Sequence, residues 1–194
     1  DFLMNNNTYE IANHIENIIK ENSNDQRANG IAFPTGININ NVVAHYTPRF
    51  DEEYYIKADD IVKIDYGVHY DGYIIDSAFT FNFNNKYKPI MEASKESVKT
   101  IIKNIGVGSH FCDLSDIADE IVNSYEYEDK GVLKPVKLIE NVYGHNIKRW
   151  NIHGGKFLYP TVQSDDTQKV EEDEIMAIEI FTSNGSGLVK LDRN

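Results

Sequence analysis

The sequence has only one cysteine, Cys112, among its 194 residues. A single cysteine cannot form a disulfide within the chain, and proteins of a reducing compartment rarely depend on disulfides. We therefore predict a cytoplasmic location for this protein.

Long apolar runs and positive charge are also scarce. No stretch approaches the roughly 20 apolar residues that span a bilayer, and no secretory signal is visible. Lysine and arginine number 19 against 31 aspartates and glutamates, which gives a formal net charge of −12. Because phosphate groups would be repelled by such a chain, we expect no nucleic-acid partner and no membrane partner.

The residues that are present suit one globular domain. The chain is 41% hydrophobic, and no repeat or linker divides it, so we predict a single catalytic domain over residues 1–194. Apolar residues at helical spacing predict helices at about 8–22, 89–104 and 113–125. Together with strand-like segments these helices predict an α+β fold, with an antiparallel-rich sheet and helices on its outside.

The segment KIDYGVHYDGYIIDSAFTF, residues 63–81, is the most informative part of the chain. Apolar or aromatic residues fill both arms, and Asp71-Gly72 between them favours a tight two-residue hairpin turn. Counting outward from this turn places Asp65 and Asp76 on the same face of the hairpin, diagonal to each other.

Two carboxylates on one face repel each other unless a cation joins them. The alternative interpretation is a pair of ordinary solvated aspartates. Aspartate is depleted from strands, however, and Asp65 and Asp76 each interrupt an apolar run. We therefore predict a metal site, and carboxylates combined with imidazole would suit manganese, iron, cobalt or zinc.

Three of the six histidines lie among apolar or glycine residues: His45 in VVAHYT, His145 in YGHNI and His153 in NIHGG. For any one of them a surface or hydrogen-bonded core position is at least as common as a functional one, but three together favour a site. Glu179 joins this set because EIMAIEIFT predicts a strand in which it shares a face with apolar residues. A carboxylate there is costly to bury unless a metal ion or a donor meets it.

Six segments, in this order, resemble the type 2 methionine aminopeptidases of the pita-bread metallopeptidase fold: GIAFPTGININNVVAHYTP, KIDYG, IIDSAFTF, GHNI, NIHGG and AIEIF. The resemblance runs from about Gly30 to Gly187. It implies a methionyl aminopeptidase that removes the N-terminal methionine of nascent proteins with a hydroxide activated by two divalent metal ions (Mn, Co, Fe or Zn). A peptide or nascent-chain N-terminus would be the substrate, and the ribosome a further partner.

The resemblance also implies four metal ligands in this chain. Asp65 would chelate one ion and Asp76 would bridge both. His145 and Glu179 would complete the set of ligands, and Glu179 would also shuttle the proton.

Four residues correspond to substrate-binding positions of the family. His45 matches the histidine near the scissile bond, which fumagillin-type epoxides modify, and His153 matches the histidine that contacts the substrate carbonyl. Phe33 and Ile152 match residues that line the methionine side-chain pocket. The implied catalytic residues are His45, His153 and Glu179.

The chain departs from the family pattern in three ways. A fifth ligand, a glutamate in a QFEH-like strand, has no counterpart before Asn194. The helical insertion of type 2 enzymes and the last strands of the second half are also absent. We therefore expect a C-terminally incomplete fold whose dinuclear site is not complete in this chain. Tyr143 stands where relatives usually carry asparagine before Gly-His.

Two other functions fit the same fold. One is a metal-free pita-bread binding protein, but retention of the six polar site residues and the negative charge disfavour it. The other is a peptidase of the prolidase or aminopeptidase P kind, which shares the ligand types. The AHYT, GHNI and NIHGG contexts favour the methionine enzyme over this second alternative.

Overall fold

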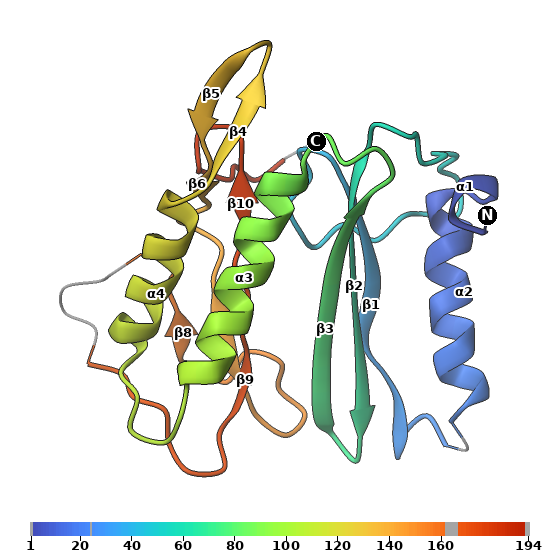
Figure 1. Ribbon diagram of the computed structural model, residues 1–194. Helices are drawn as coiled ribbons and strands as arrows, with labels where there is room; N and C mark the ends of the chain where they lie inside the picture. The colour runs from blue at the N-terminus through green and yellow to red at the C-terminus, as the bar shows by residue number, and fades with distance from the viewer. Residues whose placement is uncertain (1, 24, 162–166, 193–194) are drawn as a thin grey trace. The chain divides into compact units, whose positions relative to one another are not determined.

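The computed structural model describes residues 2–23, 25–161 and 167–192. These residues form two compact units (Figure 1). The first unit comprises Asp1–Lys86 and Lys148–Ile152, and the second comprises Tyr87–Ile147 and His153–Asn194. The elements of the first unit are α1 Phe2–Asn5, α2 Thr8–Glu21, β1 Asn29–Ile39, β2 Ile61–Tyr70 and β3 Tyr73–Asn82. Those of the second are α3 Lys88–Asn104, α4 Phe111–Asn123, β4 Glu126–Asp129, β5 Val132–Pro135, β6 Lys137–Leu138, β7 Gly144–Ile147, β8 Phe157–Leu158, β9 Ile175–Ala177 and β10 Thr182–Ser183.

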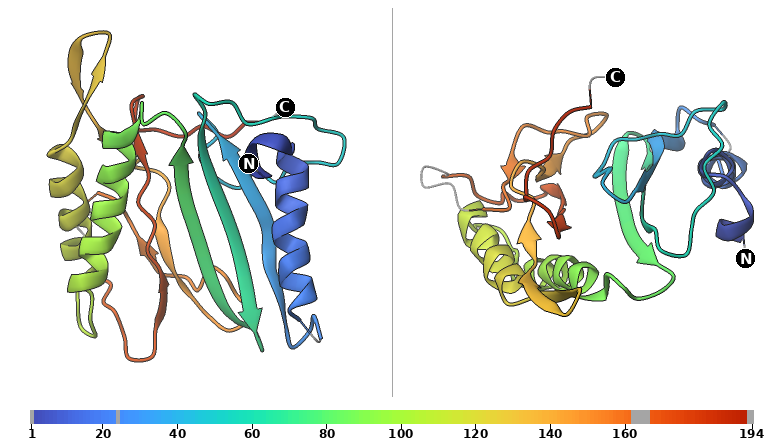
Figure 2. Two further views of the ribbon diagram at one scale, coloured as in Figure 1. Left: turned by 45° about the vertical axis from the view of Figure 1, so that its right-hand side comes forward. Right: turned by 90° about the horizontal axis from the view of Figure 1, so that it is seen from above.

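In the first unit, α2 runs along the antiparallel sheet β1–β2–β3 (Figure 2). The helix begins where the sequence supplies a capping box: the Asn7 side chain accepts a hydrogen bond from the Glu10 amide at 2.9 Å, and the Glu10 carboxylate accepts one from the Asn7 amide at 2.8 Å. The apolar stripe of α2 then packs through Ile11 against Ile37 and Ile64 of the sheet. One face of β1 and β2 is thereby covered, which leaves the other face for polar residues.

The predicted hairpin is confirmed. Strands β2 and β3 pair with Asp65 opposite Ala78 and Asp76 opposite Gly67. The turn residues Asp71 and Gly72 have φ of 47° and 80°, the left-handed values that a tight two-residue hairpin turn requires at both positions.

The second unit is built around α3 and α4, which pack side by side (Figure 1). Both helices, and α2, confirm the predicted helices to within two residues at each end. Their apolar faces enclose a core that includes Phe111, Leu114 and Leu158. Strand β7 is the central strand of the antiparallel sheet β8–β7–β9, so all four of its residues are buried.

The α+β prediction with an antiparallel-rich sheet is confirmed, since the strand pairs described are antiparallel. The single strand predicted for EIMAIEIFT is wrong in extent: β9 ends at Ala177 and β10 begins at Thr182. The chain leaves one sheet and joins another there, because Phe181 pairs with Ile139 beside β6 (N···O 2.9 Å). In the part of the chain that the structure describes, no helix has the length and apolar character needed to cross a membrane.

Candidate metal centre

The two aspartates of the hairpin lie on the face of the first-unit sheet that α2 does not cover. Asp65 pairs with Gly36 of β1 on one side and with Ala78 of β3 on the other. Both aspartates are partly buried. Gly36 packs closely beside Asp65, because a Cβ added to Gly36 would lie 3.6 Å from the Asp65 Cβ, an ordinary van der Waals contact.

Phe33 reaches the same face from β1. Its ring covers Gly67, since a Cβ built on Gly67 would come within 2.2 Å of the ring carbon Cε1. Gly67 is the cross-strand partner of Asp76, so the phenyl ring and the carboxylates share one surface. The register of β1 shifts on either side of Phe33, and such a bulge re-aims side chains locally.

His45 lies in the connection between β1 and β2 and is exposed. Its backbone has a left-handed φ of 63°. The next residue is fixed to β1: the Tyr46 amide donates to Asn38 Oδ1 at 2.9 Å, and the Tyr46 carbonyl accepts from the Ile37 amide at 2.9 Å. His45 therefore directly precedes Tyr46, a residue that hydrogen bonds hold against β1.

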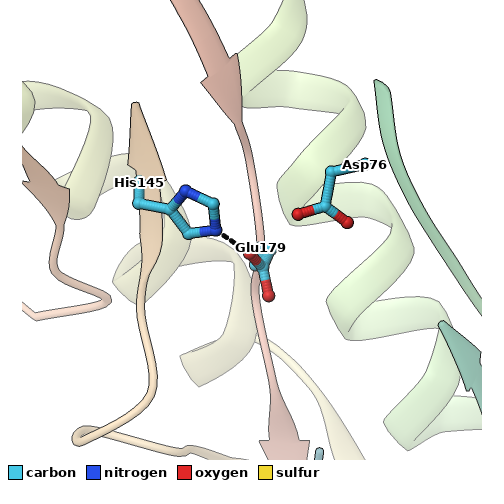
Figure 3. Close-up of side chains that lie close together, drawn as sticks. All are labelled: Asp76, His145 and Glu179. Atoms are coloured by element: carbon cyan, nitrogen blue, oxygen red, sulfur yellow. Dashed lines mark ion pairs between the residues drawn. The ribbon is translucent and has the colours of Figure 1, made fainter. Parts of the chain in front are cut away.

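The second unit brings His145 and Glu179 together. His145 Nε2 lies 3.1 Å from Glu179 Oε1, and their side chains are 5% and 26% exposed. Figure 3 shows the imidazole of His145 facing the Glu179 carboxylate, and it also draws Asp76 on its strand of the first unit. Two donor atoms that share an ion at about 2.1 Å, at angles between about 90° and 109°, lie about 3.0 to 3.4 Å apart. The pair therefore has the separation of two ligands of one metal ion.

His153 lies beside His145 in the second unit. The two imidazole centroids are 4.5 Å apart and the rings are inclined at 69°. Tyr143, the unusual residue before Gly-His, packs edge-on against Tyr159 at 4.8 Å and against Phe157 at 6.0 Å. The tyrosine thus belongs to an aromatic cluster that supports the start of β7.

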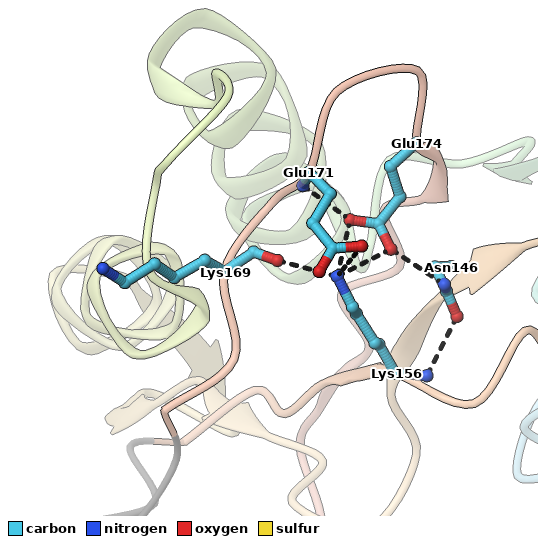
Figure 4. A network of polar contacts seen from close by, with 5 residues as sticks. All are labelled: Asn146, Lys156, Lys169, Glu171 and Glu174. Carbon is cyan, nitrogen blue, oxygen red and sulfur yellow. Dashed lines mark hydrogen bonds and ion pairs between the residues drawn. The ribbon is translucent and has the colours of Figure 1, made fainter.

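A network of polar side chains that the sequence did not predict includes Asn146, the residue after His145 (Figure 4). Lys156 Nζ lies 3.0 Å from Glu174 Oε1 and 3.4 Å from Glu171 Oε2, and Asn146 donates to Glu174 at 2.8 Å. The acidic run EEDE at 171–174 has the composition of a solvated turn, but the Glu174 side chain is only 7% exposed. The network joins residues 28 apart in sequence, so spacing along the chain gives no sign of it.

Hydrogen bonds keep Glu174 and Lys156 charged. Burial acts to raise the pKa of Glu174, but bonds from the Glu171 amide, Lys156 and Asn146 outweigh it and hold that pKa below its ordinary value. Burial acts to lower the pKa of Lys156, and its bonds to Glu174 and Glu171 outweigh that and raise it. A buried charge that is paired and hydrogen-bonded in this way is stable only while its partners stay in place.

The predicted site residues are divided between the two units. The first unit contains Phe33, His45, Asp65, Asp76 and Ile152, and the second contains His145, His153 and Glu179. Within the first unit, Phe33 and the two aspartates share a face. Within the second, His145 contacts both Glu179 and His153. Ile152 is partly buried.

The antiparallel sheets, the carboxylates on a hairpin face and the paired imidazole and carboxylate define a metallopeptidase of the pita-bread fold. The chain belongs to metallopeptidase family M24, whose model matches residues 4–192.

Known proteins agree with this assignment. Methionine aminopeptidase 2 of Candida dubliniensis is 46% identical over 184 residues, which cover 93% of this chain and 40% of that protein. The chain thus spans about two fifths of the length of this curated relative. The methionine aminopeptidase of Rickettsia prowazekii has the same fold (TM-score 0.78, 18% identity, 96% of this chain and 73% of that one). So has the prolidase of Pyrococcus horikoshii OT3 (TM-score 0.67, 24% identity, 90% and 46%).

Proposed function

We propose that the protein removes the N-terminal methionine from peptides and nascent chains in the cytoplasm, and that residues 1–194 belong to one catalytic domain. The observation that carries the proposal is the pairing of buried His145 with Glu179 at ligand separation. The sequence likeness to proteins named methionine aminopeptidase 2 supports the choice of substrate. Bound divalent ions would supply Lewis-acid charge to polarise the scissile carbonyl.

Four residues would hold two divalent ions: Asp65, Asp76, His145 and Glu179. Carboxylate oxygen and imidazole nitrogen are donors that suit manganese, cobalt, iron and zinc. The partial burial of both aspartates and the burial of His145 support this role, because a site shielded from water strengthens the attraction between a cation and its ligands.

The other residues would bind and orient the peptide. His153 would donate a hydrogen bond to the carbonyl oxygen of the scissile bond, where negative charge develops. His45 would contact the same bond from the loop before β2. Glu179 would accept a proton from the attacking water and return it to the leaving amine. Phe33 and Ile152 would exclude water from around the methionine side chain.

Hydrolysis of two peptides tests the proposal. The full-length gene product, loaded with Mn²⁺ or Co²⁺, is expected to cleave Met-Ala-Ser and to leave X-Pro peptides intact. Loss of cleavage in EDTA and its return with Mn²⁺ would show that the ions are needed. Turnover of X-Pro peptides alone would replace the proposal by a prolidase or aminopeptidase P activity.

A calorimetric titration with Mn²⁺ separates the enzyme from a binding protein of the same fold. The methionine enzyme is expected to bind two ions per full-length molecule, and comparison with the 194-residue chain shows how many of them this chain holds. A full-length protein that binds no ion would belong to the binding proteins. Cosedimentation with translating ribosomes tests the ribosome as a further partner.

A further inference from the structure

Asn146 bonds through all four of its polar groups. Its backbone amide donates to the Lys156 carbonyl at 3.1 Å, and its carbonyl accepts from the Gly154 amide at 2.7 Å. Its side-chain oxygen accepts from the Lys156 amide at 2.9 Å, and its side-chain nitrogen donates to Glu174 at 2.8 Å. Asn146 itself is 3% exposed.

These bonds reach the three segments that carry the site residues of the second unit. Asn146 follows His145 directly, and Gly154 follows His153. Glu174 precedes β9, the strand that leads toward Glu179. A change at Asn146 therefore acts on all three segments at once.

The Asn146 side chain is tightly packed between its neighbours and has little room to move. A Cβ added to Gly154 would come within 2.5 Å of Asn146 Oδ1, so the glycine lets the His153 segment close on the amide. On the other side, Lys156 Nζ bonds to Glu174 at 3.0 Å and to the Lys169 carbonyl at 2.9 Å. The Glu174 carboxylate also accepts from the Glu171 amide at 2.9 Å (Figure 4). Asn146, Lys156, Glu171 and Glu174 are thus each held by at least two other members of the network, which is typical of polar networks that fix a single arrangement.

We propose that Asn146 is a positioning residue: bonded to Glu174 and to the segment Gly154–Lys156, it sets the separation of His153 from His145 and Glu179. This inference rests on the function proposed above. Partners behind metal ligands and substrate-contacting residues hold their geometry, and loss of such a partner typically lowers activity or metal affinity by about 10- to 100-fold.

A pair of substitutions reverses the polarity of one bond in this network. Asn146→Asp keeps the acceptor for the Lys156 amide but turns a carboxylate oxygen toward Glu174, where a donor stood. Glu174→Gln supplies the missing donor. In the double variant the amide introduced at position 174 can donate to the carboxylate introduced at position 146, and the summed charge of the two positions is that of the wild type.

The control is Asn141→Asp. The Asn141 side chain, like that of Asn146, both donates and accepts, in its case to the Val189 carbonyl and from the Val189 amide at 2.8 Å each. It bonds to none of the three site segments through these contacts. This variant is expected to keep the kcat of the wild type.

The four proteins of this double-mutant cycle are compared in the full-length gene product by kcat and KM for Met-Ala-Ser, by Mn²⁺ affinity and by the Tm of the metal-free protein. Asn146→Asp is expected to lower kcat by about tenfold or more with a smaller change in KM. The double variant is expected to recover kcat to within about threefold of the wild type. A lower kcat in an Asn146→Asp protein whose Tm is unchanged, recovered in the double variant, is the result that a purely structural role would not produce.

Two results would overturn the inference. One is an Asn146→Asp protein whose Tm falls while its kcat stays at the wild-type value. The other is a double variant in which the two losses simply add. If the wild type itself does not cleave Met-Ala-Ser, the proposed function has failed. The Mn²⁺ affinities of the four proteins then test the inference. Losses of affinity that simply add in the double variant would exclude a positioning role.

Discussion

The phenyl ring of Phe33 lies so close over Gly67 that a Cβ at position 67 would be 2.2 Å from the ring carbon Cε1. Gly67→Ala must therefore push the ring away from the face that carries Asp65 and Asp76. If Phe33 lines the methionine pocket, kcat/KM for Met-Ala-Ser should fall by about tenfold. The stability loss expected from overpacking is about 1 to 3 kcal/mol, measurable by urea unfolding.

The control for this substitution is Gly106→Ala, because nothing lies within 4 Å of a Cβ at that position. Its kcat/KM should match that of the wild type. A Gly67→Ala protein with unchanged kcat/KM would remove Phe33 from the pocket.

Two hairpin turns allow a second comparison. Gly72 in the β2–β3 turn and Gly131 in the β4–β5 turn both have φ of 80°. An added Cβ at Gly72 would lie 2.4 Å from the Trp150 ring, whereas Gly131 has open space. Both alanine variants carry the left-handed backbone cost of about 1 to 2 kcal/mol, so the Gly72→Ala protein should be the less stable because of Trp150.

Removal of the indole tests that explanation. Trp150→Ala should bring the cost of Gly72→Ala close to that of Gly131→Ala, as measured by urea unfolding of the single and double variants. An unchanged difference between the two glycine variants would mean that the ring swings aside at no cost.

The lowered pKa of Lys63 predicts that the free energy of unfolding depends on pH. Burial lowers its pKa from 10.5 to about 8, while its ammonium donates to the Asn40 carbonyl at 2.9 Å. Between those two pKa values the unfolded chain binds a proton that the folded chain has lost, so the free energy of unfolding should rise with pH in this window. In Lys63→Met this rise should be smaller, as measured by urea unfolding from about pH 7.5 to about pH 10. Parallel curves for the two proteins would contradict the lowered pKa.

His145 and Glu179 should both matter for metal binding. His145→Ala and Glu179→Ala are each expected to weaken Mn²⁺ binding by at least about tenfold, because each would remove one of the donors proposed above. Calorimetry checks this, with His14→Ala as the control, since His14 lies exposed on α2. Equal affinities in all three variants would show that the 3.1 Å contact is only a hydrogen bond.

Local pattern was enough to predict the hairpin. The turn residues Asp71 and Gly72 fix the register, and the two-residue period of a strand then assigns Asp65 and Asp76 to one face. The helices were equally clear, since the stripe that includes Ile11 repeats at helical spacing.

Contacts between distant segments were not predictable in the same way. The bond from Asn146 to Glu174 joins two polar residues that look ordinary in sequence, and the strand pattern through Glu179 gave no sign that pairing would change sheets after Ala177. In both cases tertiary hydrogen bonds decide the outcome, and neither composition nor periodicity carries that information.

The segment Lys148–Ile152 completes the first unit although most of the second unit precedes it in sequence. Its Trp150 amide donates to the Gly72 carbonyl at 2.8 Å, and Arg149 binds the Asp71 carbonyl at 2.8 Å across 78 positions of sequence. During synthesis the hairpin tip therefore waits for these residues to leave the exit tunnel. Until Arg149 and Trp150 have been synthesised and have emerged, the Asp71-Gly72 turn lacks these contacts.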